Sequence, residues 1–349
     1  MIDYYKKLER NIYKLYFLNF FKGLIFITPF FVLYFQESGI NYFQVLMILS
    51  AQSFFQISFE VPSGIISDYY GRKVVLILAS VFRILGALFY LGSNFFSFLC
   101  GGMFFGISIA FTSGSDTSLI FDSLRELKKE NMFQEKHGNF FSLNQLAIGL
   151  ASLLGSFIFA FGSYKATIFF TLLSFLISFF ISISLKEPNT KRQSRDTKYF
   201  SHLKEAINYA KNHKKIKILF LFMMIVYGLI MISHRFFQPF LEDINISIKH
   251  FGIIYFIWLS ISAFGASFAS KIRKKIGEFN SILIIPIFLS LSFFSFFFFS
   301  NYIAFLLIIL NQFCWGFTKP IIDSIVICSL ESHNKATVLS LKGFMINVL

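Results

Sequence analysis

Long apolar runs alternate along the chain with short polar segments, and within each run the apolar residues follow one another without a break. A helix needs about 20 mostly apolar residues to cross a bilayer, and each run is long enough. Strands of a transmembrane barrel would instead alternate residue by residue. The pattern therefore predicts an all-α integral membrane protein. We count ten complete spans, near residues 13–36, 42–66, 74–93, 95–120, 140–162, 166–185, 216–240, 250–270, 279–299 and 302–328.

Composition agrees with this prediction. Of the 349 residues, 56% are hydrophobic and only 14% are charged, whereas soluble domains contain about 25% charged residues. The first apolar run is too long for a cleaved signal peptide, so we expect a retained helix. Cys100, Cys314 and Cys328 lie in apolar runs without ligand spacing, as small buried side chains do. We expect no metal and no cofactor.

The net charge of +14 is distributed very unevenly. If the N-terminus is cytoplasmic, the cytoplasmic segments hold 25 basic residues and the opposite side holds only Lys165 and Lys249. This asymmetry follows the positive-inside rule. Nucleic-acid binding would need a folded basic face, which these short segments do not provide. We therefore expect a monomer in the plasma membrane, with the lipid bilayer and a small solute as its partners and no nucleic acid.

A charged island separates the second and third apolar runs: Gly64-Ile-Ile-Ser-Asp68-Tyr-Tyr-Gly71-Arg72-Lys73. We expect a tight loop at the bilayer surface, with Gly71 in a turn conformation that other residues avoid. Asp68 is placed to cap a helix N-terminus. Arg72 is placed to pair with Asp122, at the end of the fourth run; the alternative is that Asp122 is an ordinary surface acid. The spacing of this island closely resembles the signature loop between helices two and three of the major facilitator superfamily.

Residues 113–124 and 335–341 also resemble segments of that superfamily. The resemblance implies two parallel six-helix bundles that rock about a central cavity, which helices one, four, seven and ten line. It implies a conformational switch at Gly64, Asp68, Gly71, Arg72, Lys73 and Asp122. Candidates for the cavity are then Asn19, Lys22, Asp116, Tyr227, His234, Asn311, Trp315, Lys319 and Asp323. Asp116 and Glu60 are the candidates for proton coupling.

The domain prediction follows from the one clear linker. Residues 1–185 form an N-terminal bundle, residues 186–215 a basic linker, and residues 216–349 a C-terminal bundle that is truncated in its eleventh helix. Phe200, Leu203, Ile207 and Ala210 have helical spacing within the linker, which predicts an amphipathic helix on the inner leaflet. The repeat between the halves is weak. The segment 271–277 keeps the bases and final glycine of the island, but Lys274 stands where the first half has Asp68.

Charges inside the apolar runs are costly and need partners. Lys22 either snorkels to the inner surface or faces a cavity. For Arg83 we expect an acidic partner, Glu60 or Asp116, and a permanent Arg83–Asp116 pair would make Asp116 purely structural. Lys319 and Asp323 are four residues apart, so they could neutralise each other within one helix.

No phosphate-binding glycine-lysine loop and no nucleophile elbow occur in the sequence, so we expect a transporter and not an enzyme or an ATP-driven pump. The resemblance implies secondary transport of a small organic solute, driven by an ion gradient, with protons favoured. Two features of proton antiporters are missing, an arginine at the position of Gly102 and a Gly-Pro pair near residues 149–157. Efflux is therefore only slightly favoured over uptake of a metabolite, and a non-transporting remnant is a further alternative.

Overall fold

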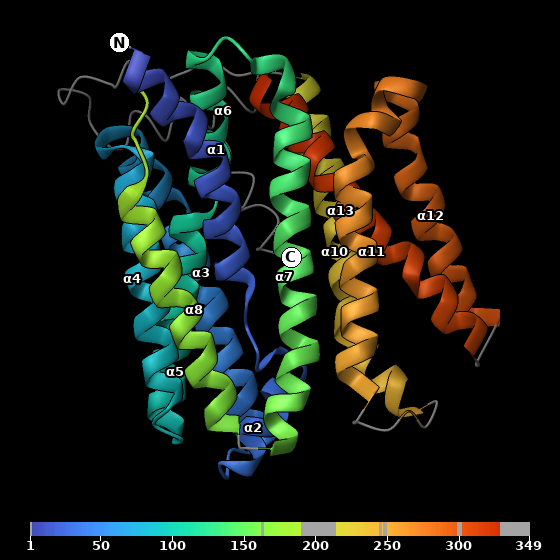
Figure 1. The fold of residues 1–349 in the computed structure, drawn as a ribbon. Coiled ribbons are helices and arrows are strands. Elements are labelled where there is room, and N and C mark those ends of the chain that lie inside the picture. Colours follow the sequence, from blue (N-terminus) through green and yellow to red (C-terminus); the bar gives the residue numbers. More distant parts are fainter. Residues whose placement is uncertain are drawn as a thin grey trace.

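The computed structural model describes residues 2–161, 164–189, 214–243, 246, 250–298 and 302–328. Within these ranges every regular element is helical, which confirms the predicted all-α class (Figure 1). The helices are α1 (Ile2–Gly23), η1 (Thr28–Phe30), α2 (Phe31–Glu37), α3 (Tyr42–Tyr70), α4 (Arg72–Tyr90), α5 (Phe95–Thr112), α6 (Ser115–Glu126), η2 (Glu130–Met132), α7 (Phe133–Phe161), α8 (Tyr164–Ser184), α10 (Lys214–Asp243), α11 (Phe251–Ile276), α12 (Glu278–Phe298) and α13 (Tyr302–Cys328). The amphipathic helix predicted in the linker lies outside the described residues.

Seven helical stretches of the described chain are long and apolar enough to cross a membrane, and α10 and α12 carry shorter apolar stretches. Their outward surfaces are rich in large apolar side chains, among them Phe54, Phe96 and Phe180, which are all exposed. Contiguous apolar surface of this kind is rare on soluble monomers, and lipid tails would cover it in a bilayer. The protein is therefore a multi-pass membrane protein.

Two of the predicted spans are interrupted, which the apolar pattern did not predict. The first span consists of α1, a break after Gly23, and then η1 and α2. The fourth consists of α5 and α6, separated at Gly114, whose φ of 72° suits a residue without a side chain. Lys22 stands in the last turn of α1 and Asp116 in the first turn of α6. A cation at a helix C-terminus and an anion at an N-terminus are both favoured by the helix dipole.

The charged island is not the loop that the sequence analysis expects. Helix α3 continues through Tyr70 and α4 begins at Arg72, so Gly71 is the only residue between them (φ 103°, ψ 155°). Asp68 therefore lies in the last turn of α3. The second half has the same junction, because Gly277 (φ 86°, ψ 168°) is the only residue between α11 and α12.

Helices α7 and α11 run side by side and join the two halves (Figure 1). A Cβ on Gly138 would lie 2.5 Å from the carbonyl oxygen of Ala266, and one on Gly252 would lie 2.0 Å from Ser156 Oγ. Between these points Gln145 Nε2 donates a hydrogen bond to Ser262 Oγ (2.9 Å). Small residues thus allow the two backbones to approach closely at both ends of the contact.

We predict that Gly106→Ala destabilises the protein by about 1–3 kcal/mol, the usual cost of overpacking. Gly102 and Gly106 of α5 face α3, and a Cβ on Gly106 would lie 2.2 Å from the backbone oxygen of Gln52. The control is Gly149→Ala, whose Cβ would meet its nearest atom, on the Phe256 side chain, at 3.3 Å. Thermal unfolding of both variants in detergent tests this, and an equal loss in both would contradict the packing argument.

Candidate functional site

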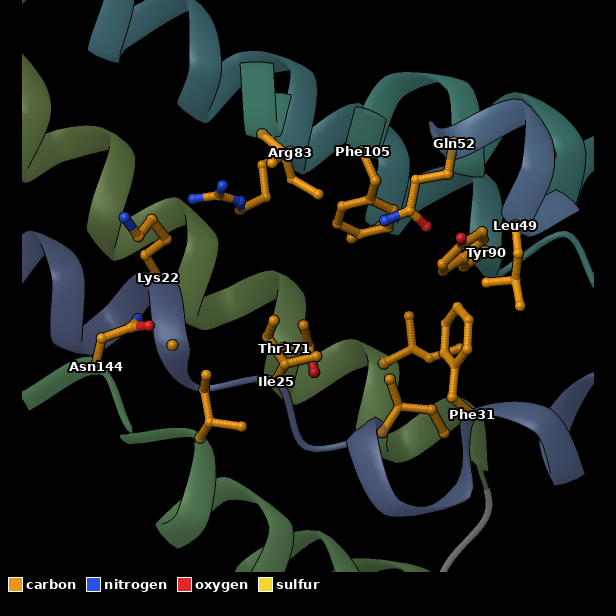
Figure 2. Close-up of a pocket in the computed structure, with 16 residues that line it drawn as sticks. Lys22, Ile25, Phe31, Leu49, Gln52, Arg83, Tyr90, Phe105, Asn144 and Thr171 are labelled. Atoms are coloured by element: carbon orange, nitrogen blue, oxygen red, sulfur yellow. The ribbon is translucent and has the colours of Figure 1, made fainter. Parts of the chain in front are cut away.

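A cavity of about 410 Å³ lies inside the first group of helices (Figure 2). Its walls come from α1, α2, α3, α4, α5, α7 and α8 and from the break between α1 and η1. Most of the lining side chains are aliphatic or aromatic. The lining residues are Lys22, Gly23, Ile25, Ile27, Phe31, Leu49, Gln52, Arg83, Ala87, Tyr90, Phe105, Ile109, Asn144, Ile148, Ile168 and Thr171.

Two cations mark one end of this cavity. Figure 2 shows Lys22 and Arg83 directed towards the same region. Lys22 Nζ lies 3.4 Å from Asp116 Oδ2 and 5.6 Å from the centre of the Phe140 ring. Lys22 therefore turns into the protein, and the snorkelling alternative is wrong.

Arg83 does not form the ion pair expected for it. Its Nη2 is 3.5 Å from Thr112 Oγ1, and its guanidinium lies over the ring of Phe175 at 5.6 Å. In the described part of the chain, no carboxylate oxygen lies within 4 Å of Arg83. Asp116 acts on it only at longer range. The reason is that Asp116 is already held, since Oδ2 faces Lys22 and Oδ1 accepts hydrogen bonds from the Thr117 amide and hydroxyl.

The opposite end of the cavity is apolar and aromatic. Figure 2 shows Phe31, Leu49, Tyr90 and Phe105 gathered there, with the amide of Gln52 among them. The Tyr90 hydroxyl is buried and has no hydrogen-bond partner among the described residues. This end can therefore enclose an apolar body and offers two polar groups, an amide and a hydroxyl, to one polar substituent.

A line of polar contacts leads from the cavity to the second group of helices. Thr117 Oγ1 is 3.1 Å from Asp116 Oδ1 and 3.3 Å from His137 Nε2. His137 Nε2 is in turn 3.7 Å from Asp323 Oδ2 on α13. The imidazole is fully buried and stacks on the rings of Phe133 (5.4 Å) and Phe140 (6.2 Å). His137 was not among the residues predicted from the sequence, and only the helix packing reveals its position.

The other predicted cavity residues form a separate cluster in the second half. His234 Nε2 lies 2.9 Å from Gln312 Oε1, and its ring packs on Trp315 (5.5 Å). Trp315 also contacts Tyr227 (5.1 Å). Asn311 Nδ2 donates to Ser233 Oγ (2.6 Å). The structure brings these four predicted residues together, but none of them lines the 410 Å³ cavity.

The remaining predicted residues connect helices. Asn19 Nδ2 donates to the carbonyl of Phe140 (2.7 Å), which ties α1 to α7. Lys319 lies over the ring of Phe141 on α7 (4.9 Å), while Asp323 reaches His137 on the same helix. Both charged groups of α13 thus contact α7, which the suggestion of mutual neutralisation within α13 did not anticipate. Glu60 is fully buried in α3 and is not a lining residue.

The predicted switch residues gather around Arg72. Its guanidinium lies between Asp68 Oδ1 (3.2 Å) and Asp122 Oδ2 (3.0 Å), and all three side chains are at most 5% exposed. The Arg72–Asp122 pair expected from the sequence is present, and the description of Asp122 as a surface acid is wrong. Gly64 is buried in α3, one helical turn before Asp68.

Glu187 completes this region, and the sequence analysis missed it. Its Oε1 accepts from the backbone N–H of Arg72 (3.0 Å) and its Oε2 from that of Lys73 (2.8 Å). A carboxylate at the N-terminus of α4 satisfies two free N–H groups and complements the helix dipole. Glu187 is 115 residues from Arg72, so no local pattern could have indicated it.

The second half has an equivalent cluster with the charges exchanged. Arg273, before the glycine, pairs with Glu278, directly after it, whereas in the first half Asp68 precedes the glycine and Arg72 follows it. Arg273 also reaches Ser324 Oγ on α13 (3.3 Å) and Gln134 Oε1 on α7 (2.7 Å). The second half therefore also has an acid at its junction, after the glycine and not at the position of Lys274.

Comparison with known proteins identifies relatives along most of the chain. A family model described as Major Facilitator Superfamily matches residues 15–349. The uncharacterized MFS-type transporter YxaM of Bacillus subtilis is 23% identical over 71% of this chain and 63% of its own length. The uncharacterized MFS-type transporter MJ1560 of Methanocaldococcus jannaschii is 24% identical over 43% of this chain and 38% of its own. The chain thus spans less than two thirds of these curated relatives.

Solved structures show the same fold at low identity. The E. coli fucose:proton symporter FucP has a TM-score of 0.78 at 14% identity, and the match covers 98% of this chain and 90% of FucP. The human organic anion transporter MFSD10 has a TM-score of 0.75 at 18% identity, with 97% and 91% covered. The nucleoside transporter NupG has a TM-score of 0.70 at 15% identity, with 97% and 88% covered.

We predict that Arg72→Gln lowers the free energy of unfolding by about 3–5 kcal/mol, because it removes one partner from a buried ion-pair cluster. The matched control is Arg273→Gln, at the equivalent junction, where Arg273 and Glu278 are 22% and 38% exposed. Water screens that pair, so its loss is expected to cost about 1 kcal/mol or less. Thermal unfolding in detergent measures both, and a larger loss for Arg273→Gln would contradict the argument from burial.

Proposed function

This chain belongs to the major facilitator superfamily, and from that membership we propose that it is a secondary transporter. Membership and the transporter folds of its structural neighbours point to transport rather than catalysis. We propose that it acts as a monomer in the cell membrane and moves a small organic solute by alternating access. The observation that carries this proposal is the cavity, which lies between helices beside the break after α1 and has two cations, Lys22 and Arg83, in its lining.

We propose that residues 1–185 and 216–349 act as two bundles that rock against each other, with residues 186–215 as the linker. Two contacts support this. Helices α7 and α11 approach each other closely through small residues, so the two bundles meet along one line about which they can rock. Arg273 of the second bundle reaches Gln134 of the first. In this proposal the cluster of Asp68, Arg72 and Asp122 controls the rate of switching and does not bind the solute.

For coupling we propose a proton site at Asp116, with Glu60 as the second candidate. Asp116 holds Lys22, which lines the cavity, and connects through Thr117 and His137 to Asp323. A proton on Asp116 would weaken the Lys22–Asp116 ion pair and would change the contact between Asp116 and Thr117. The solute site and the interface between the bundles would then respond to the same proton.

Two directions of transport follow from different observations. The sequence slightly favours efflux in exchange for protons. The Lys22–Asp116 pair favours uptake together with a proton, because protonation of Asp116 releases the Lys22 ammonium for a solute. We propose efflux as the first candidate and proton-linked uptake as the second.

We predict that Asp116→Asn removes the dependence of transport on a pH gradient while exchange of solute persists. Proteoliposomes are loaded with a defined mixture of small neutral, anionic and cationic organic compounds, and release is followed by mass spectrometry against protein-free liposomes. Proton antiport makes release faster with acid outside, whereas proton symport makes it faster with acid inside. No compound released above background would contradict transport.

The control for this experiment is Glu60→Gln, which removes the other candidate carboxylate and is expected to keep the gradient dependence. If Asp116→Asn keeps the dependence and Glu60→Gln loses it, the coupling site is Glu60 and the Lys22–Asp116 pair is structural.

We predict that the glycine junctions face the cytoplasm. In a cysteine-free background, Lys274→Cys, three residues before Gly277, is expected to resist a membrane-impermeant thiol reagent added to intact cells. Lys165→Cys, at the opposite end of the bundle, is expected to react, since Lys165 is exposed. The reverse pattern would invert the topology and overturn the cytoplasmic N-terminus.

A further inference from the structure

We propose that the cavity binds an organic anion, with its acidic group between Lys22 and Arg83 and its apolar body against Phe31, Leu49 and Phe105. This inference rests on the proposed function, because it names the class of solute for the same cavity. The proposed function rests on the presence of the cavity, whereas this inference rests on the balance of charge in the cavity wall.

Positive charge is in excess at the end of the cavity where Lys22 and Arg83 lie. Two lining residues are cations, and no lining residue is an acid. The nearby carboxylate of Asp116 is held by Lys22, and Lys319 adds a further positive charge that acts on Lys22. Within the described residues Arg83 thus has a hydroxyl and an aromatic ring as its near contacts, although it is only 7% exposed.

A buried cation without a close counter-ion is costly, and an anionic ligand would remove that cost. A guanidinium is also suited to this role because its planar donors match the two oxygens of a carboxylate. The Lys22 ammonium lies at the same end and can contribute a second, less directional charge. A cationic solute would meet two like charges there, which excludes that class.

The rest of the lining argues against a strongly polar anion. Its walls are mainly isoleucine, leucine and phenylalanine side chains, which cannot satisfy the hydroxyl groups of a sugar or polyol. Gln52 and the Tyr90 hydroxyl stand at the apolar end, so one distal polar substituent can be accommodated. The volume of about 410 Å³ falls in the range of sites for small organic ligands. The ligand class is therefore an amphipathic organic acid of low mass.

Direct binding to the purified full chain in detergent tests this without any need for transport. The probes are three matched pairs of acid and neutral amide: benzoate with benzamide, naphthalene-2-carboxylate with 2-naphthamide, and decanoate with decanamide. At least one acid is expected to bind at least tenfold more tightly than its amide. Arg83→Gln is expected to remove that preference, and Arg83→Lys is expected to keep part of it, which separates loss of charge from loss of fold.

The matched control is Arg10→Gln, because Arg10 is exposed in α1 and lies far from the lining. It is expected to bind as the unmodified chain does. Equal binding of acid and amide in all three pairs, or a preference that survives Arg83→Gln, would overturn the inference. If acids bind through Arg83 but nothing is released from proteoliposomes, the anion site stands and transport fails. If neutral solutes are released and Arg83→Gln has no effect, transport stands and the anion site fails.

Discussion

An ionised side chain in hydrocarbon is so costly that it must find a partner or a polar space, and this requirement explains where the helices of the first bundle break and meet. Lys22 and Asp116 lie at the ends of α1 and α6, where each complements a helix dipole, and there they meet at 3.4 Å. Gly23, at the end of α1, and Ile25 and Ile27, in the break that follows it, form part of the cavity wall. A single ion pair between two interrupted helices thus fixes one end of the cavity.

The same requirement acts differently at the glycine junctions. Each junction is a single glycine, which leaves the angle between the two helices free unless a further interaction fixes it. Both halves provide an ion pair across the glycine and a contact from its arginine to another helix of the same half, Asp122 in the first and Ser324 in the second. The signs of the pair are exchanged between the halves. The two halves therefore share an ion pair across the glycine, but they differ in whether the acid or the arginine comes first.

Sequence reasoning predicted what depends on local composition and missed what depends on packing. The apolar runs predicted the helices, because hydrophobic length alone sets them. Averaging over about 20 residues hid the breaks near Gly23 and Gly114, which occupy only a few positions. The island at 64–73 was assigned to a loop because charged residues usually leave the bilayer, yet the Asp68–Arg72 pair allows α3 to remain helical up to Gly71. Gln52, Tyr90, Asn144 and Thr171 are uncharged polar residues in long, mainly apolar helices. That signal was present, but the face that each presents became known only from the packing.

An anionic solute would link the charge of the cavity to the direction of transport. Such a solute competes with Asp116 for the Lys22 ammonium. Protonation of Asp116 therefore strengthens binding of the anion, and bound anion raises the proton affinity of Asp116 by the same factor.

The membrane potential adds about 2.3 kcal/mol per charge per 100 mV against inward movement of an anion. One accompanying proton would cancel that term, and two would reverse it. Efflux faces no such barrier, since the potential itself drives an anion outward, but protons that bind together with the anion would then move against their gradient. If Lys22 is shared between Asp116 and the solute, the Lys22–Asp116 pair therefore favours inward symport with protons. Efflux instead requires a solute that binds through Arg83 alone and leaves the Lys22–Asp116 contact intact.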